Sequence, residues 1–121
     1  MHTAAPRILV VDDNEDNRYT LDLFLRGDGH EAVATASGGR EALATIEREQ
    51  FSLVLLDIMM PDLSGEEVLT ILKSNPQTRD IPIIVISADS EHDRVSRCIE
   101  LGADDYIPKP FEPAILRARV A

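Results

Sequence analysis

Short apolar runs that end abruptly on polar residues are the feature that most limits how this chain can fold. Residues 8–11 and 53–56 are apolar at every position, and residues 83–86 are β-branched throughout. A continuous apolar run of this length predicts a strand that is covered on both faces, as in a parallel sheet. Two weaker runs, 31–36 and 105–107, predict further strands, and we expect 31–36 to lie nearer the sheet edge.

Amphipathic segments alternate with these strands. The first carries Leu21, Phe24 and Leu25 on one face, follows a loop whose Asn or Asp caps it, and ends near Gly27. Four further helices are predicted. One covers residues 37–48, and the next begins at Ser64, with Glu67 completing a capping box. A helix over 91–101 should turn Val95, Cys98 and Ile99 inward, and the last, over 111–120, is short or truncated.

Strands that alternate with helices predict an α/β fold with a doubly wound, five-stranded parallel sheet. Because crossovers are right-handed and the first and third strands are the most continuously apolar, we expect the strand order 2-1-3-4-5. The length of 121 residues and the apolar content of 44% suit one domain over residues 1–121, in which residues 1–6 form a tail. Ligands of such sheets bind beyond the carboxyl ends of the strands.

Charge and composition exclude several classes of function. Acidic residues number 22 and basic residues 12, so the net charge is −10 and direct binding to nucleic acid or to an anionic membrane surface is disfavoured. No apolar run approaches the ~20 residues that span a bilayer, and residues 1–6 lack the features of a secretory signal. The single cysteine, Cys98, cannot form an internal disulfide. We therefore expect a cytoplasmic location.

Polar side chains follow four of the predicted strands at the point where each ends: Asp12, Asp13, Asp57, Ser87 and Lys109. Any one of them alone would be an ordinary helix cap or a solvated loop residue. Together they should meet in one shallow cleft, where three carboxylates would repel one another unless a hard divalent cation, Mg²⁺ or Mn²⁺, joins them. A lysine and a hydroxyl suit phosphoryl oxygens, and an Asp carboxylate can accept a phosphoryl group covalently.

At these residues the chain resembles the receiver domains of bacterial two-component response regulators, the CheY-like superfamily, over essentially its whole length. The resemblance rests on residues 8–14, 55–65, 82–88, 102–106 and 108–111, in this order and spacing. It implies the flavodoxin/CheY-like arrangement of the sheet and an aspartyl-phosphate switch rather than an enzyme. Such a domain assists its own phosphorylation and dephosphorylation.

The resemblance also implies a role for each residue of the site. Asp57 would be the phosphoacceptor. Asp12 and Asp13 would hold Mg²⁺, Asp13 more directly and Asp12 largely through water, together with the backbone carbonyl of Met59. Ser87 and Lys109 would hold the phosphoryl group.

Four further expectations follow from the same resemblance. Tyr106 would be the aromatic switch residue, and the peptide bond between Lys109 and Pro110 would be cis. Met59 and Asp89 would tune dephosphorylation and access of the metal.

Partners are implied as well. His2, His30 and His92 show no ligand-like spacing, so the phosphoryl donor should be a separate sensor histidine kinase or histidine phosphotransfer protein. Phosphorylation would move Ser87 and Tyr106 and change the surface formed by residues 91–101, 105–107 and 111–120. That surface would control an output domain or a downstream protein and could form a homodimer. We expect the chain to be the N-terminal part of a longer response regulator.

Three other functions compete with the phosphoacceptor function. A phosphohydrolase of the haloacid-dehalogenase type needs a second Asp two residues after the nucleophile, where this chain has Met59. A flavodoxin-like mononucleotide site needs a Ser/Thr/Gly-rich loop after the first strand, where residues 12–16 are acidic or Asn. A pseudo-receiver that binds partners without phosphorylation is the remaining alternative, and the full set of acidic residues, serine and lysine disfavours it.

Overall fold

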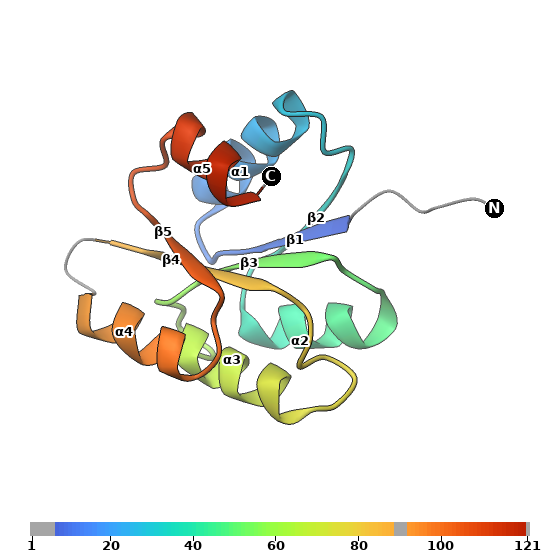
Figure 1. Cartoon of the computed structure of the whole chain (residues 1–121). Helices are drawn as coiled ribbons and strands as arrows, with labels where there is room; N and C mark the ends of the chain where they lie inside the picture. The colour runs from blue at the N-terminus through green and yellow to red at the C-terminus, as the bar shows by residue number, and fades with distance from the viewer. Residues whose placement is uncertain (1–6, 89–91, 121) are drawn as a thin grey trace.

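The computed structural model describes residues 7–88 and 92–120. A parallel sheet of five strands forms its centre, in the order β2-β1-β3-β4-β5 (Figure 1). The strands are β1 (Arg7–Val11), β2 (Ala32–Ala36), β3 (Leu53–Asp57), β4 (Ile83–Ser87) and β5 (Asp105–Pro108). The predicted fold class and strand order are therefore confirmed, and β2 lies at an edge as expected.

Helices cover both faces of the sheet (Figure 1). On one side lie α1 (Glu15–Gly27) and α5 (Pro113–Val120), and on the other lie α2 (Gly39–Arg48), α3 (Gly65–Ser74) and α4 (His92–Glu100). The side chains of β1 alternate between the two layers. Leu9 and Val11 pack with the α2, α3 and α4 side, whereas Ile8 and Val10 pack with the α1 and α5 side. Such two-sided burial requires a strand that is apolar at every position.

Two of the helix caps follow the sequence prediction. Asn14 is the N-cap of α1 and accepts from the backbone N–H of Asn17, and Ser64 caps α3 in a capping box with Glu67. The start of α2 was predicted two residues too early, because the helix begins at Gly39 and its N-cap is Gly38.

Helix α4 also differs from its prediction in one side chain. Val95 and Cys98 are buried as expected, but Ile99 is 44% exposed. The inward orientation predicted for Ile99 was wrong, because α4 packs on α3 and β4 through a narrow stripe and the neighbouring position faces solvent.

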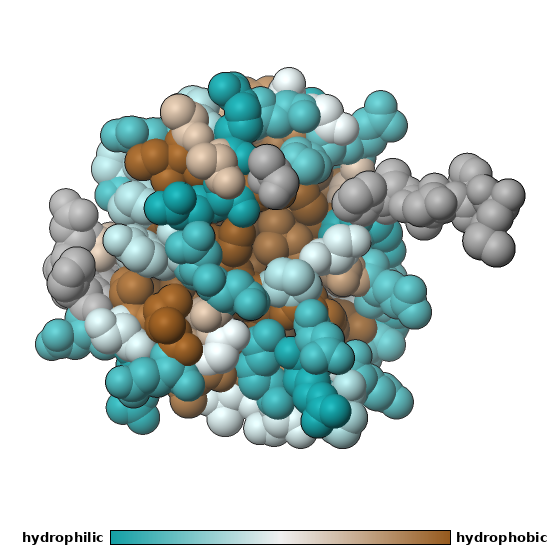
Figure 2. Space-filling model, viewed as in Figure 1, coloured by the Kyte–Doolittle hydropathy of each residue, from teal (hydrophilic) through white to brown (hydrophobic). Residues whose placement is uncertain are grey.

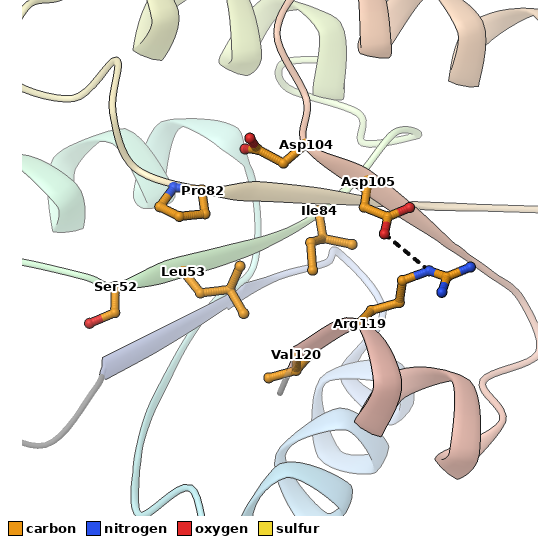
Figure 3. Close-up of a pocket in the computed structure, with 8 residues that line it drawn as sticks. All are labelled: Ser52, Leu53, Pro82, Ile84, Asp104, Asp105, Arg119 and Val120. Carbon is orange, nitrogen blue, oxygen red and sulfur yellow. Dashed lines mark ion pairs between the residues drawn. The ribbon is translucent and has the colours of Figure 1, made fainter.

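Hydrophobic side chains gather near the centre of the face seen in Figure 2, surrounded by hydrophilic ones. A hollow of about 330 Å³ is lined by the apolar residues Leu53, Ile84 and Val120 and by three charged residues, Asp104, Asp105 and Arg119 (Figure 3). Ser52 and Pro82, which precede β3 and β4, also line it, so it lies at the amino ends of these strands. This hollow is therefore separate from the strand ends at which the polar residues gather.

Within the described part of the chain, every helix is too short or too polar to span a bilayer.

Candidate functional site

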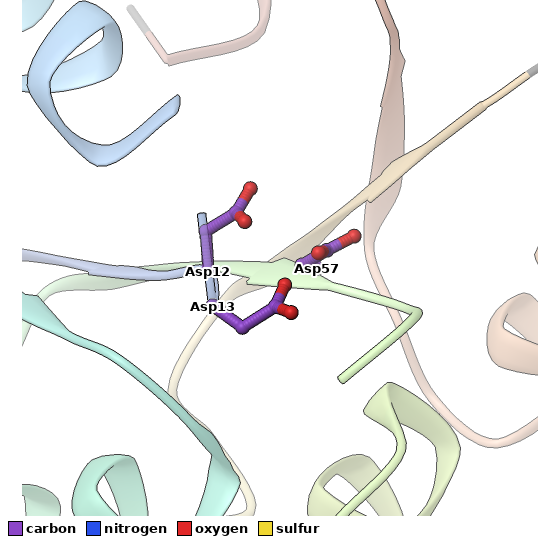
Figure 4. A group of neighbouring side chains, drawn as sticks. All are labelled: Asp12, Asp13 and Asp57. Carbon is purple, nitrogen blue, oxygen red and sulfur yellow. The ribbon is translucent and has the colours of Figure 1, made fainter. Parts of the chain in front are cut away.

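Three carboxylates meet at the carboxyl ends of β1 and β3. The two strands pair in parallel with Val11 opposite Leu56, so Asp12 and Asp57 follow on neighbouring strands at the same level. Oxygen atoms of Asp12, Asp13 and Asp57 lie within 4.8 Å of one another, and the three side chains project in the same direction (Figure 4). Asp12 and Asp57 are almost completely buried, whereas Asp13 is exposed. The predicted meeting of these three residues is confirmed.

The first turn of α1 holds the Asp12 carboxylate in place. Its oxygens accept from the backbone N–H of Asn14 at 2.9 Å and from the side-chain amide of Asn17 at 3.3 Å. Arg18 donates to the backbone carbonyl of Asp12 at 2.8 Å. Sequence reasoning did not identify Asn17 or Arg18. They follow Asp12 by five and six residues. A helix that starts at Glu15 therefore brings both side chains close to the end of β1.

Lys109 brings a positive charge to the same place. Its Nζ lies 3.2 Å from Asp57 Oδ1 and 3.8 Å from Asp12 Oδ2. The backbone N–H of Lys109 donates to the Ser87 carbonyl at 2.8 Å, which anchors the residue to the end of β4. Because β4 lies between β3 and β5, the lysine side chain has to reach past one strand to contact Asp57.

Burial dominates the electrostatics of the acceptor carboxyl. It raises the pKa of Asp57 to about 6, and the negative charge of Asp12 adds to this effect. The hydrogen bond from Lys109 and the nearby backbone N–H of Met59 lower the pKa and so act in the opposite direction. The pKa remains raised because burial and the Asp12 charge outweigh these two contacts. A bound cation would relieve the same conflict.

Two further predicted site residues, Ser87 and Met59, lie on β4 and after β3. Ser87 is buried at the end of β4, one residue beyond Ile86, which pairs with Asp57. Met59 follows Asp57 by two residues, and its side chain is 54% exposed.

Tyr106 does not line the carboxylate cluster. It lies on β5, where it pairs with Val85 of β4, and it is 38% exposed. It lines a separate surface hollow with Val95 and Ile99. The peptide bond between Lys109 and Pro110 is cis. Asp89, predicted to tune dephosphorylation, lies outside the described residues.

Two long-range contacts involve the segment that follows Asp57, and sequence reasoning missed both. Asp62 accepts from the backbone N–H groups of Gly39 and Arg40 at 3.1 and 3.0 Å, so it caps α2. Arg94 of α4 donates to the carbonyl of Ile58 at 3.3 Å. No local sequence pattern predicts either contact, because each joins segments more than 20 residues apart.

The donor set fits a hard divalent cation. Asp12, Asp13 and Asp57 offer only carboxylate oxygens, and no His or Cys is among them. Oxygen ligands of this kind suit Mg²⁺, which is commonly bound through one or two carboxylates together with water and phosphate oxygens. This arrangement is typical of the magnesium site of receiver domains.

Comparison with known proteins gives one consistent result. The family model described as "Response regulator receiver domain" matches residues 8–121. The chain is 44% identical over 121 residues to the "Probable transcriptional regulator ycf27" of Pyropia yezoensis, covering 99% of this chain and 48% of that protein. It is 45% identical over 116 residues to the "Transcriptional regulatory protein PrrA" of Mycobacterium tuberculosis, covering 96% of this chain and 48% of that protein.

A solved structure gives the same answer. The chemotaxis protein CheY4 of Vibrio cholerae superposes with a TM-score of 0.89 at 28% identity, covering 97% of both chains. The chain spans about half the length of the two transcriptional regulators that it matches. On the family model, the sequence relatives and the fold together, the chain belongs to the response regulator receiver domain family.

Proposed function

We propose that the chain is a magnesium-dependent phosphoacceptor switch in which Asp57 takes a phosphoryl group from a sensor histidine kinase or a histidine phosphotransfer protein. The observation that carries the proposal is the Asp57 carboxylate, buried at a strand end and placed 3.2 Å from Lys109 within a cluster of three carboxylates. The chain would regulate an output and would not turn over a substrate, although it assists its own phosphorylation and dephosphorylation.

In this proposal an oxygen of the Asp57 carboxylate forms a bond to phosphorus. The bond between phosphorus and the donor nitrogen breaks, and its electron pair leaves with the donor imidazole. Asp12, Asp13, Asp57 and the Met59 carbonyl would hold Mg²⁺, with Mn²⁺ as a substitute. When bound, the cation would neutralise charge on the phosphoryl oxygens.

Residues of the chain would then hold the phosphoryl group. Lys109 supplies a point positive charge, and Ser87 supplies a hydroxyl donor. The positions of both residues favour these roles, since Lys109 already contacts Asp57 and Ser87 ends the neighbouring strand. Met59 and Asp89, which follow Asp57 and Ser87 by two residues each, are proposed to tune the lifetime of the phosphoryl group.

Phosphorylation replaces the single negative charge of the Asp57 carboxylate by a phosphoryl group that carries about −1.5 to −2 units of charge. We infer that this charge draws Ser87 toward the phosphoryl group and shifts the population between two arrangements of the surface formed by α4, β5 and α5. Tyr106 is the residue of β5 proposed to change its position. In this structure Tyr106 is 38% exposed, and the proposal assigns it a more buried position in the phosphorylated state.

The surface formed by α4, β5 and α5 is proposed to contact an output domain, a downstream protein or a second copy of the chain. A longer response regulator that carries this domain is in keeping with the two transcriptional regulators, of which the chain covers 48%. Direct nucleic-acid binding by these residues is disfavoured by the net charge of −10. A cytoplasmic location belongs to the same proposal.

The proposal is tested by incubation with acetyl phosphate and Mg²⁺, followed by intact mass measurement. We expect a single phosphoryl adduct that is absent from Asp57→Asn and absent when EDTA is present. No adduct on the unaltered chain, together with no binding of beryllofluoride, would instead support a pseudo-receiver that acts by protein contact alone.

A further inference from the structure

Arg94 ties helix α4 to the backbone beside the proposed phosphoacceptor. Its guanidinium donates to the carbonyl oxygen of Ile58 at 3.3 Å and contacts the sulfur of Met59. The same guanidinium forms a bidentate ion pair with Glu66 of α3, in which Nε lies 3.0 Å from Oε2 and Nη2 contacts Oε1. Arg94 therefore joins α3, α4 and the segment after β3.

The contact with Ile58 matters because of the peptide group to which that carbonyl belongs. The Ile58 carbonyl and the Met59 N–H are the two ends of one planar peptide group. The Met59 N–H lies near enough to the Asp57 carboxylate to lower its pKa. At the other end, the Ile58 carbonyl accepts from Gly65 N–H at 2.8 Å and from Arg94. Holding the carbonyl fixes the direction in which the N–H points.

We propose that Arg94 is a positioning residue, which is held by Glu66 and orients the Ile58–Met59 peptide group toward the Asp57 carboxylate, so that the geometry of the acceptor site depends on the position of α4. The proposal rests on the proposed function, since it assigns a purpose to the same site. It adds a residue of α4 to the groups that govern the site.

Charge explains why Glu66 is part of the arrangement. Arg94 and Asp13 line the same hollow, of about 370 Å³, so the guanidinium lies close to a carboxylate proposed to hold a cation. An unpaired arginine there would compete with Mg²⁺ for the carboxylates. The bidentate contact with Glu66 directs the guanidinium to α3, and its hydrogen bonds lower the pKa of Glu66 so that this partner stays ionised.

A consequence for regulation follows. Helix α4 belongs to the surface that we propose to contact partners, and Arg94 belongs to α4. A partner that moves α4 would withdraw the guanidinium from the Ile58 carbonyl and loosen the Met59 N–H at Asp57. Partner binding and Mg²⁺ binding would then be coupled in both directions, as linkage requires. The lifetime of the phosphoryl group would change when the partner binds.

The test compares Mg²⁺ affinity, measured by calorimetry on the phosphate-free chain, with the rate of phosphoryl loss after labelling by acetyl phosphate. Arg94→Ala should weaken Mg²⁺ binding about 5- to 10-fold, the effect of one lost hydrogen bond. Removal of a nearby positive charge alone would strengthen it, so the two explanations differ in sign. Arg94→Lys keeps the charge without the bidentate geometry and should behave like Arg94→Ala.

Arg97→Ala is the matched control, because it removes the same charge from an exposed position of the same helix. It should leave Mg²⁺ affinity unchanged or slightly increased. Glu66→Gln should weaken Mg²⁺ binding, and the double variant with Arg94→Ala should be no weaker than Arg94→Ala, because both residues act through one contact. Phosphoryl loss should change in Arg94→Ala and Glu66→Gln but not in Arg97→Ala.

Thermal unfolding of each variant separates positioning from general destabilisation. If Arg94→Ala does not fold, Glu66→Gln and Arg94→Lys carry the test. Arg94 variants that bind Mg²⁺ as tightly as the unaltered chain, and lose phosphoryl at the same rate, would overturn the positioning role while the proposed function stands. Absence of both Mg²⁺ binding and labelling in the unaltered chain would overturn both proposals.

Discussion

Lys109 Nζ lies 3.2 Å from Asp57 Oδ1, although 52 residues separate the two along the chain. The contact joins the end of β5 to the end of β3 across the intervening strand. It places a positive charge within reach of both Asp57 and the buried Asp12, which lies 3.8 Å from the lysine Nζ. The predictions below start from this balance of charges.

Lys109→Ala should slow phosphorylation by acetyl phosphate about 100-fold, because a preorganised donor to a developing negative charge is lost. It should also raise the pKa of Asp57 further, since Lys109 now lowers it. A time course of intact mass at saturating Mg²⁺ measures the rate. The control is Arg119→Ala, which removes a positive charge on α5 that pairs with Asp105 at the other end of β5. Equal rates in both variants would rule out a role for Lys109 at the phosphoryl group.

Asp57→Asn should stabilise the metal-free chain at neutral pH. Burial raises the pKa of Asp57 from 3.8 to about 6, so the folded state binds this proton more tightly than the unfolded state. The carboxyl therefore contributes most to stability at acid pH, and that contribution falls as pH rises from about 4 to about 6. The gain from Asn at pH 7 is at most ~3 kcal/mol.

Urea unfolding in EDTA at several pH values measures this effect as the difference between Asp57→Asn and the unaltered chain. The difference should grow between pH 4 and pH 6 and then level off. A difference that stays constant over this range would show that the pKa of Asp57 is not raised.

Mg²⁺ should stabilise the chain by mass action, by about 2.7 kcal/mol when its free concentration is 100 times the dissociation constant. Asp13→Asn should abolish most of this gain and leave the metal-free stability nearly unchanged, because Asp13 is exposed. Thermal unfolding with and without Mg²⁺ measures both quantities. A full Mg²⁺ response in Asp13→Asn would remove Asp13 from the metal site.

Asp62→Ala should lower the free energy of unfolding by about 1 kcal/mol, the usual effect of losing an N-cap acceptor. The N-cap residue of α2, Gly38, has no side chain to offer, and Asp62 accepts from Gly39 and Arg40 instead. Asp62→Asn retains an acceptor oxygen and should lose less. Urea unfolding, with the exposed Asp80→Ala as control, compares them. Equal losses in Asp62→Ala and Asp80→Ala would argue against the cap.

How much of the site could be predicted depends on where its residues stand relative to the strands. Asp12, Asp57, Ser87 and Lys109 all follow apolar runs, and parallel strands bring their carboxyl ends to one edge of the sheet. The meeting of Asp12, Asp57 and Lys109 was therefore predictable before any coordinates. The resemblance predicts a role for Tyr106. It does not predict that this side chain lies half-exposed on β5, away from the carboxylates.

By itself, the sequence determined the elements, the strand order and the acidic cluster, because hydrophobic periodicity and the positions of strand ends are local features that constrain the topology strongly. Only the tertiary structure decided that Arg94 reaches Ile58, that Asp62 caps α2, and that Ile99 faces solvent. These outcomes depend on how α3 and α4 pack and on the path of the loop after Asp57. Side-chain contacts between distant segments are set by that packing, and no spacing along the chain encodes it.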